Sequence, residues 1–169
     1  MGMRIEPVTD FGVFDKPLRN IRASLDGEAV TLDLIPETTR LVSRASSSDM
    51  PDVEQRIVFG DKDVAREIVE SDKSLRVNFD PVWGWVTYRE TSDGGFPTID
   101  MTDWPRLADT RFYYPFGRVI HSPWLAAVPD DQLPTVGNFV HFRILSATTC
   151  MDIISNEPEG GWRDNLKRS

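Results

Sequence analysis

The first element that the hydrophobic pattern predicts is a β-hairpin near the N-terminus. Apolar and polar side chains alternate along residues 28–35, which is the period-two pattern of a strand with one buried face. Residues 20–25 also read as a strand. Asp26-Gly27 lies between them and is a strong turn signal, because this pair tolerates the positive φ of a type I′ turn. We therefore expect two paired strands, the second ended by Pro36.

The pattern then changes over residues 44–71. Residues 44–53 are rich in Ser, Asp and Pro, which favour local turns, so we expect a loop. A short strand is predicted at residues 55–59 and a helix at about residues 61–71. The apolar side chains of that last segment fall on one helical face: Val64, Ala65, Ile68 and Val69.

The remaining chain reads mostly as short strands. These are predicted at residues 75–79, 82–90, 118–121, 139–146 and 150–154. A helical turn is expected at residues 123–128, with Pro at its start. Residues 96–117 give no clear pattern, because prolines interrupt them. The sum is an α+β fold with a mainly antiparallel sheet of about seven or eight short strands and one or two helices. We expect one domain over residues 1–156 and a flexible polar tail over residues 157–169.

Composition narrows the classes of protein without naming an activity. The 169 residues are 40% hydrophobic and 27% charged, with 19 basic and 27 acidic side chains and a formal net charge of −8. These values exclude a collagen-like repeat, a disulfide scaffold and a basic nucleic-acid binder. Acids and bases are interleaved in both halves. This argues against a nucleic-acid mimic, which must present one charge per about 1.7 Å of duplex axis.

We expect no targeting signal or membrane span in this sequence. Residues 1–6 lack the apolar stretch of a secretory signal, and the longest apolar run, residues 124–128, is far shorter than the roughly 20 residues of a membrane span. The single cysteine, Cys150, cannot form an internal disulfide. We therefore expect a cytoplasmic protein with neither a membrane nor a nucleic-acid partner.

One catalytic hypothesis combines His121, His141, Cys150 and Asp152. A cysteine nucleophile needs a base that lowers its pKa and an acid that orients the base. His141 and Cys150 lie on strands that we expect to pair. The structural alternative is favoured, because Cys150 and Ile154 share a strand face and cysteine is usually buried and inert.

Other chemistry finds less support in the sequence. Asp100 and Asp103 could join His121 and His141 in a metal site, but Asp103 is followed by Pro105, so helix capping is the favoured interpretation of these two carboxylates. Phosphate-binding glycine loops, zinc-binding pairs and the hydrolase elbow are all missing. We therefore expect no metal and no cofactor.

Aromatic residues form the last group of candidates. Trp83 and Trp85 are predicted to share a strand face with Arg89, and they could line a ligand pocket or belong to the core. Tyr113 and Tyr114 lie in an irregular segment, where surface sites are more common. Together with the histidines, the predicted binding residues are Trp83, Trp85, Arg89, Tyr113, Tyr114, His121 and His141.

Three functions follow from these observations. The leading hypothesis is a small acidic protein that binds another protein, for example an immunity or antitoxin-like neutraliser of a basic toxin. Charge complementarity would speed such an association. The alternatives are an enzyme that uses the histidine, cysteine and aspartate residues, and a small-ligand module built on Trp83 and Trp85. Exposed aromatic side chains would also suit a homodimer.

Overall fold

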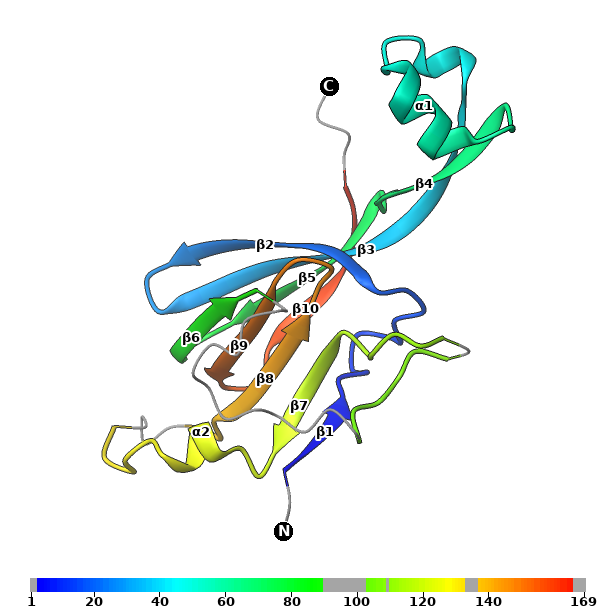
Figure 1. Cartoon of the computed structure of the whole chain (residues 1–169). Coiled ribbons are helices and arrows are strands. Elements are labelled where there is room, and N and C mark those ends of the chain that lie inside the picture. Colours follow the sequence, from blue (N-terminus) through cyan, green and yellow to red (C-terminus); the bar gives the residue numbers. More distant parts are fainter. Residues whose placement is uncertain (1–2, 90–102, 109, 133–136, 166–169) are drawn as a thin grey trace.

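The computed structural model describes residues 3–89, 103–108, 110–132 and 137–165. The described part of the chain forms ten strands in two sheets, together with two short α-helices and one 3-10 turn (Figure 1). The architecture is mostly antiparallel and broadly α+β, as expected, but it has more strands than predicted.

The first sheet has the order β1-β7-β8-β9-β6, and all its neighbours are antiparallel. Its strands are β1 (Arg4–Pro7), β7 (Phe116–Ile120), β8 (Val140–Leu145), β9 (Cys150–Ser155) and β6 (Val82–Tyr88). The pairing of β8 with β9 confirms the hairpin expected from the sequence. Helix α2 (Pro123–Ala126) follows β7 and is capped by the Ser122 side chain, which accepts a hydrogen bond from the Leu125 amide.

The second sheet has the order β10-β5-β3-β2. It is built from β10 (Glu159–Asp164), β5 (Lys73–Phe79), β3 (Ala29–Ser43) and β2 (Leu18–Asp26). The predicted turn joins β2 to β3, and Gly27 adopts a φ of +60° there. Strand β10 occupies part of the expected tail, and Trp162 anchors it by donating its indole N–H to the Phe11 carbonyl at 2.8 Å.

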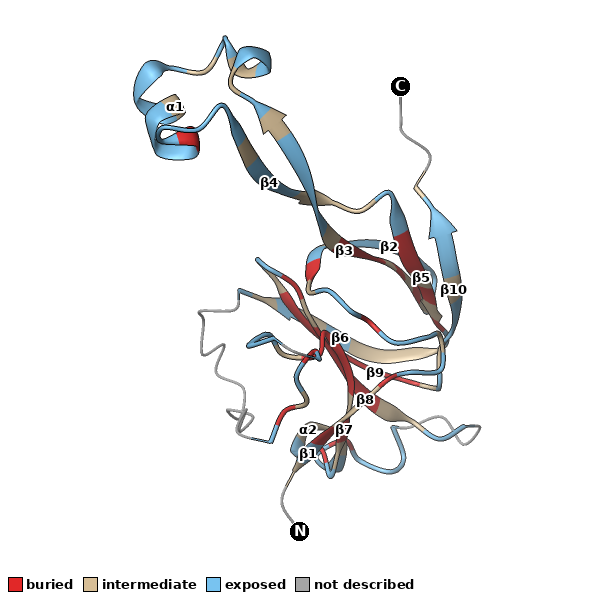
Figure 2. Ribbon diagram, turned by 90° about the vertical axis from the view of Figure 1, so that its right-hand side faces the viewer, coloured by how far each residue is buried: buried red, intermediate tan, exposed pale blue. Residues whose placement is uncertain are grey.

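The two sheets enclose the main hydrophobic core. Alternate residues of the central strands belong to this core, and Figure 2 shows the buried residues along these strands. The largest are Leu32, Leu34, Leu75, Phe79, Phe116, Phe142, Ile144 and Ile153. The same alternation turns the opposite set of side chains outward. Consequently each sheet has an outer face on which polar residues gather, and these faces carry two of the candidate sites.

An arm leaves the second sheet (Figure 1). Strand β3 does not end at Pro36, as predicted, but continues to Ser43, and its outer half pairs with β4 (Val64–Glu70). We use "the arm" for residues 37–70. Its tip holds the 3-10 turn η1 (Ala45–Ser47) and helix α1 (Asp52–Phe59).

Both elements predicted over residues 55–71 are therefore wrong. The expected strand at residues 55–59 is helix α1, and the expected helix at residues 61–71 is strand β4. Val64, Ile68 and Val69 fit helical spacing, but they are β-branched and suit a pleated strand better. Pairing with β3 decides between the two conformations, because it supplies the strand's hydrogen bonds.

Candidate functional site

A buried polar network lies on the outer face of the first sheet. Asp152 of β9 receives two parallel hydrogen bonds from the Arg143 guanidinium of β8, each 2.7 Å long. The His141 Nε2 lies 2.9 Å from Asp152 Oδ1, and Tyr88 of β6 donates its hydroxyl to Oδ2 at 2.9 Å. Antiparallel register places Arg143 directly opposite Asp152, so neighbouring strands bring the charges together.

Ser122 extends this network to helix α2. Its Oγ lies 2.7 Å from His141 Nδ1. The ring of Trp124, two residues along the chain, packs edge-on against the imidazole with centroids 5.3 Å apart. The side chains of His141 and Asp152 are only 4% and 1% exposed. His141 and Asp152 are therefore closed to solvent, and Trp124 of α2 packs against the imidazole.

The electrostatics of the network favour an ionised Asp152. Burial by itself raises the pKa of Asp152, but hydrogen bonds from His141 and Arg143, together with the Arg143 charge, outweigh it and hold the pKa below its usual value. Burial and the nearby Asp152 charge raise the pKa of Tyr88 well above its usual range, so its hydroxyl stays a donor. Arg143 and Asp152 thus form a charge pair whose hydrogen-bonding groups are largely satisfied.

Ser122, His141 and Asp152 are the residue types of a hydrolytic triad, but the arrangement differs from one. In that triad the acid binds Nδ1 and the serine binds Nε2, whereas here the two ring nitrogens have exchanged partners. The Ser122 hydroxyl is buried and also caps α2. These contacts favour a structural role, because a nucleophile must meet its substrate.

The predicted catalytic group is only partly assembled. His141 and Asp152 do meet, but their partners are Ser122, Arg143 and Tyr88. Cys150 is buried, and both nitrogens of His141 are occupied by other groups. His121 is exposed, with a φ of +58°. Asp100 lies outside the described residues, and no cluster able to hold a metal occurs in the part of the chain that the structure describes.

The predicted aromatic residues separate into different environments. Trp83 contacts the Trp124 ring, and a bulge between Val82 and Gly84 breaks the expected alternation with Trp85. Trp83 and Trp85 nevertheless line one open hollow of about 320 Å³, so the ligand-module hypothesis stays a prediction. Arg89 is exposed at the end of the described segment.

The two adjacent tyrosines, Tyr113 and Tyr114, also differ in their burial. Tyr114 was expected at the surface, but it is buried. Its hydroxyl accepts a hydrogen bond from the Phe14 N–H and donates one to the Val8 carbonyl. Tyr113 is half-buried, and the Arg106 guanidinium lies 4.5 Å from its ring centroid. A tertiary contact with the N-terminal segment thus makes Tyr114 a core residue.

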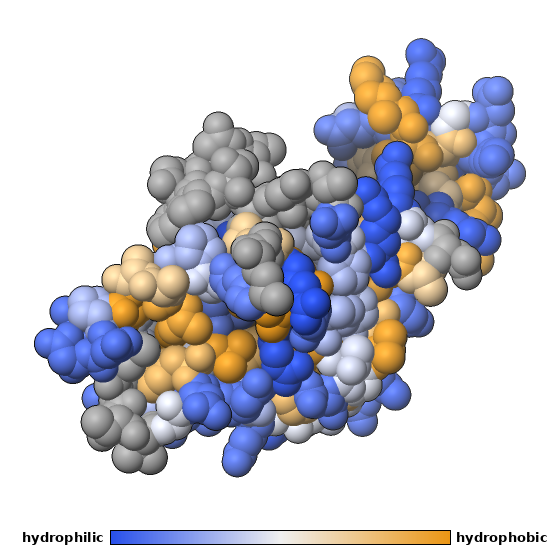
Figure 3. Space-filling view, turned by 90° about the horizontal axis from the view of Figure 1, so that it is seen from below, coloured by the Kyte–Doolittle hydropathy of each residue, from blue (hydrophilic) through white to orange (hydrophobic). Residues whose placement is uncertain are grey.

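The sequence pattern did not predict the arm as a candidate site. Six of the eleven large hydrophobic residues that are exposed in the described structure lie on it. Leu41, Val64 and Ile68 share one face of the β3–β4 ribbon, because Leu41 is flanked by the register pairs Ser43–Val64 and Thr39–Ile68. Val53 and Ile57 lie one turn apart on α1 and are 70% and 79% exposed. Figure 3 shows apolar side chains among hydrophilic ones on the arm's surface.

Carboxylates surround these apolar side chains at the tip. Residues 49–63 contain five acids and two bases, and all five acids are exposed: Asp49, Asp52, Glu54, Asp61 and Asp63. None of the five forms an ion pair with another described residue. The tip therefore combines exposed apolar side chains with uncompensated negative charge.

The tip is nevertheless an ordered structure. Phe59 is buried beneath the Arg44 guanidinium, 5.6 Å from the ring centroid. Arg44 also donates to the carbonyls of Gly60 and Lys62 at 2.6 and 3.2 Å. Gln55 bonds the carbonyls of Ser47 and Met50, which ties α1 to the loop before it. These contacts hold the outward face of α1 in a defined position.

Comparison with known proteins adds no identification. No family model, curated protein or solved structure matches the chain. Among the described residues, no helix is long and apolar enough to cross a membrane.

Proposed function

We propose that this protein binds another protein through the arm, and that the partner presents an apolar surface bordered by basic side chains. The observation that carries the proposal is the exposed set of apolar side chains on the arm: Leu41, Val53, Ile57, Val58, Val64 and Ile68. Isolated exposed hydrophobic residues are common, but a group of them on one projecting element is typical of interaction sites.

The build of the arm supports a binding role. An isolated two-stranded ribbon is marginally stable in water, and none of the arm's residues belongs to the main core cluster. The exposed apolar side chains therefore add little to the folded monomer. A partner that covers them would recover the free energy of burial, about 25 cal/mol per Å² of apolar surface.

The charge of the tip specifies the partner's chemistry. The five unpaired carboxylates described above would attract a basic surface and speed its association, an effect that salt screens. A basic toxin neutralised by this protein is a partner of this kind. A second copy of the chain would bring two acidic tips together, which disfavours a homodimer through the tip.

The test begins by identifying the partner protein in the cells that produce this protein. A photo-crosslinking residue at position 57 should give an adduct with one partner, and the same residue at exposed position 13, outside the arm, should not. The purified partner is then titrated with Val53→Ser/Ile57→Ser protein. We expect affinity to fall by roughly tenfold or more, because apolar anchors dominate interfaces. Val13→Ser is the matched control, since Val13 is also 71% exposed.

The electrostatic part has a separate readout. Asp52→Asn/Glu54→Gln protein should associate more slowly and with a weaker salt dependence, whereas Asp130→Asn/Asp131→Asn should leave both unchanged. A partner whose affinity ignores the Val53 and Ile57 changes would overturn the proposal. So would crosslinking only to a second copy, together with a dimer in sedimentation that the same changes abolish.

A further inference from the structure

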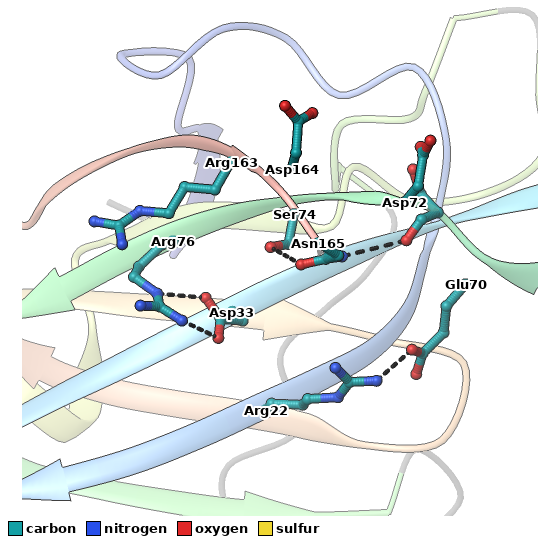
Figure 4. Close-up of a pocket in the computed structure, with 10 residues that line it drawn as sticks. Arg22, Asp33, Glu70, Asp72, Ser74, Arg76, Arg163, Asp164 and Asn165 are labelled. Carbon is teal, nitrogen blue, oxygen red and sulfur yellow. Dashed lines mark hydrogen bonds and ion pairs between the residues drawn. The ribbon is translucent and has the colours of Figure 1, made fainter. Parts of the chain in front are cut away.

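A polar cavity of about 590 Å³ lies at the foot of the arm, on the outer face of the second sheet (Figure 4). Its lining includes three arginines, Arg22, Arg76 and Arg163, from three different strands. The volume is within the range of small-molecule sites, about 300–1,000 Å³. The buried network and the apolar side chains of the arm take no part in it.

Sheet register explains why the arginines meet. Arg22 of β2 pairs with Asp33 of β3, Asp33 pairs with Arg76 of β5, and Arg76 pairs with Gly161 of β10. Directly paired residues project from the same face of a sheet. These four therefore form one row across the outer face, and Arg163 lies two residues beyond Gly161 on that face.

The charges of the row are unequal. Arg76 makes a two-bond pair with Asp33, at 2.7 Å for each bond, and Arg22 pairs with Glu70. Within the described structure the guanidinium of Arg163 has neither a hydrogen-bond nor an ion-pair partner. The pKa of Asp33 is lowered by its hydrogen bonds from Arg76 and by the charges of Arg76, Arg163 and Arg22. The positive charge of all three arginines is therefore felt at the Asp33 carboxylate.

The other carboxylates of the lining do not neutralise Arg163. In Figure 4 the Asp164 and Asp72 side chains point away from the Arg76–Asp33 pair. Asp164 alternates with Arg163 along β10 and so projects from the opposite face of the strand. One guanidinium thus remains available beside a second that is already fixed in orientation.

Gly161 keeps the space beside these guanidiniums open. A Cβ added to Gly161 would meet nothing within 4 Å, so the row has a gap next to Arg76. The floor offers further polar groups, with Ser74 donating its hydroxyl to the Asn165 side chain at 2.8 Å. The lining is polar, so it suits a ligand with hydroxyl groups better than an apolar one.

We propose that this cavity binds a small polyhydroxylated molecule through its phosphate or carboxylate group, with Arg163 and Arg76 holding the oxyanion. Planar guanidinium forks match both oxyanions and bind them with charge-assisted hydrogen bonds. The oxygens of Asp33, Glu70 and Asn165 would accept hydrogen bonds from the ligand's hydroxyl groups.

Calorimetric titration of the protein (residues 1–169) with three probes tests this proposal. Glucose 6-phosphate and gluconate carry the two oxyanions, and glucose carries neither. We expect at least one of the anions to bind with a saturable isotherm and glucose to bind roughly tenfold or more weakly. Arg163→Gln should lower the affinity for the anion by roughly tenfold or more, which is the usual cost of losing a charge-assisted hydrogen bond. Arg66→Gln on the arm should leave this affinity unchanged.

A steric variant separates loss of charge from loss of space. Gly161→Leu keeps every charge and fills the gap beside Arg76. It should abolish binding while circular dichroism and the unfolding midpoint show an intact fold. The proposal is overturned if neither anion binds at tens of millimolar, if glucose binds as well as the anions, or if Arg163→Gln and Gly161→Leu leave the affinity unchanged.

Discussion

At the scale of single residues, Asp152 has the largest predicted effect on stability, because the side chains of Tyr88, His141 and Arg143 all hydrogen-bond its carboxylate. Replacing it by Asn would leave the Arg143 charge buried without a counterion. Breaking a buried ion pair in this way costs about 3–5 kcal/mol. Glu67→Gln is the control, since the Arg40–Glu67 pair is exposed and such pairs contribute about 0–1 kcal/mol. Urea unfolding at neutral pH measures both losses.

The same residue predicts how stability depends on pH. The pKa of Asp152 is lowered in the folded state, so its contribution is complete above the unfolded value of about 3.9 and is lost as pH falls through the folded pKa. We expect the free energy of unfolding to decline below about pH 4, and to decline less steeply in Asp152→Asn protein. Equal slopes in the two proteins between pH 4 and pH 2 would contradict this assignment.

Some of this network was accessible from the sequence. His141 and Arg143 alternate with apolar residues on a strand, and Asp152 lies on the strand expected to pair with it, so the approach of His141 to Asp152 could be predicted. Ser122 and Tyr88 could not, because α2 and β6 reach the network only through tertiary packing. Tyr114 was wrongly predicted at the surface for the same reason, because the partners of its hydroxyl are about 100 residues away in the chain.

At the scale of elements, β3 unites two environments in one strand. Up to Leu34 it lies between β2 and β5, and beyond Pro36 it pairs with β4 alone. Local opening costs little where few apolar contacts cover the backbone. We expect amide hydrogens of residues 37–43 to exchange roughly a hundredfold faster than those of residues 30–34. Hydrogen exchange with mass spectrometry resolves the two halves, and uniform protection along β3 would contradict the marginal stability assigned to the arm.

The elements also show where pattern reading fails. The Asp26-Gly27 hairpin and the β8–β9 pair were predictable, because buried strands have one apolar face and a local turn. In the arm both faces of the ribbon are partly exposed, so the period-two signal disappears and helical spacing in residues 64–69 becomes misleading. Strand β10 was not predicted for a related reason. Its positions 160 and 161 are glycines, so the segment has no alternating side-chain pattern, and only pairing with β5 makes it a strand.

At the scale of the whole molecule, the two proposed sites share a boundary. Glu70 ends the arm, accepts a hydrogen bond from Asn20 at 2.8 Å and pairs with Arg22 of the cavity. The arm and the cavity are otherwise built from different residues: the arm from the ribbon and its tip, the cavity from the sheet's outer face. A single deletion can therefore separate protein binding from ligand binding.

Glu37 and Glu70 are register partners at the base of the arm, so an Asn-Gly turn can replace residues 38–69 and close a short hairpin there. This deletion removes no residue of the main core cluster and retains Glu70 with its contacts. We expect the shortened protein to unfold cooperatively, to bind the oxyanion probe with unchanged affinity, and to lose the arm's protein partner completely.

Truncation after Asn156 is the opposite control, because it removes Trp162 and Arg163 together with β10. It should leave the arm intact, lower the unfolding midpoint and abolish probe binding. Loss of probe binding in the arm deletion, with its fold intact by circular dichroism, would mean that the cavity depends on the arm beyond Glu70. Retention of the partner by the same deletion would place the protein interface on the two sheets instead, and would show that the exposed apolar side chains of the arm do not bind this partner.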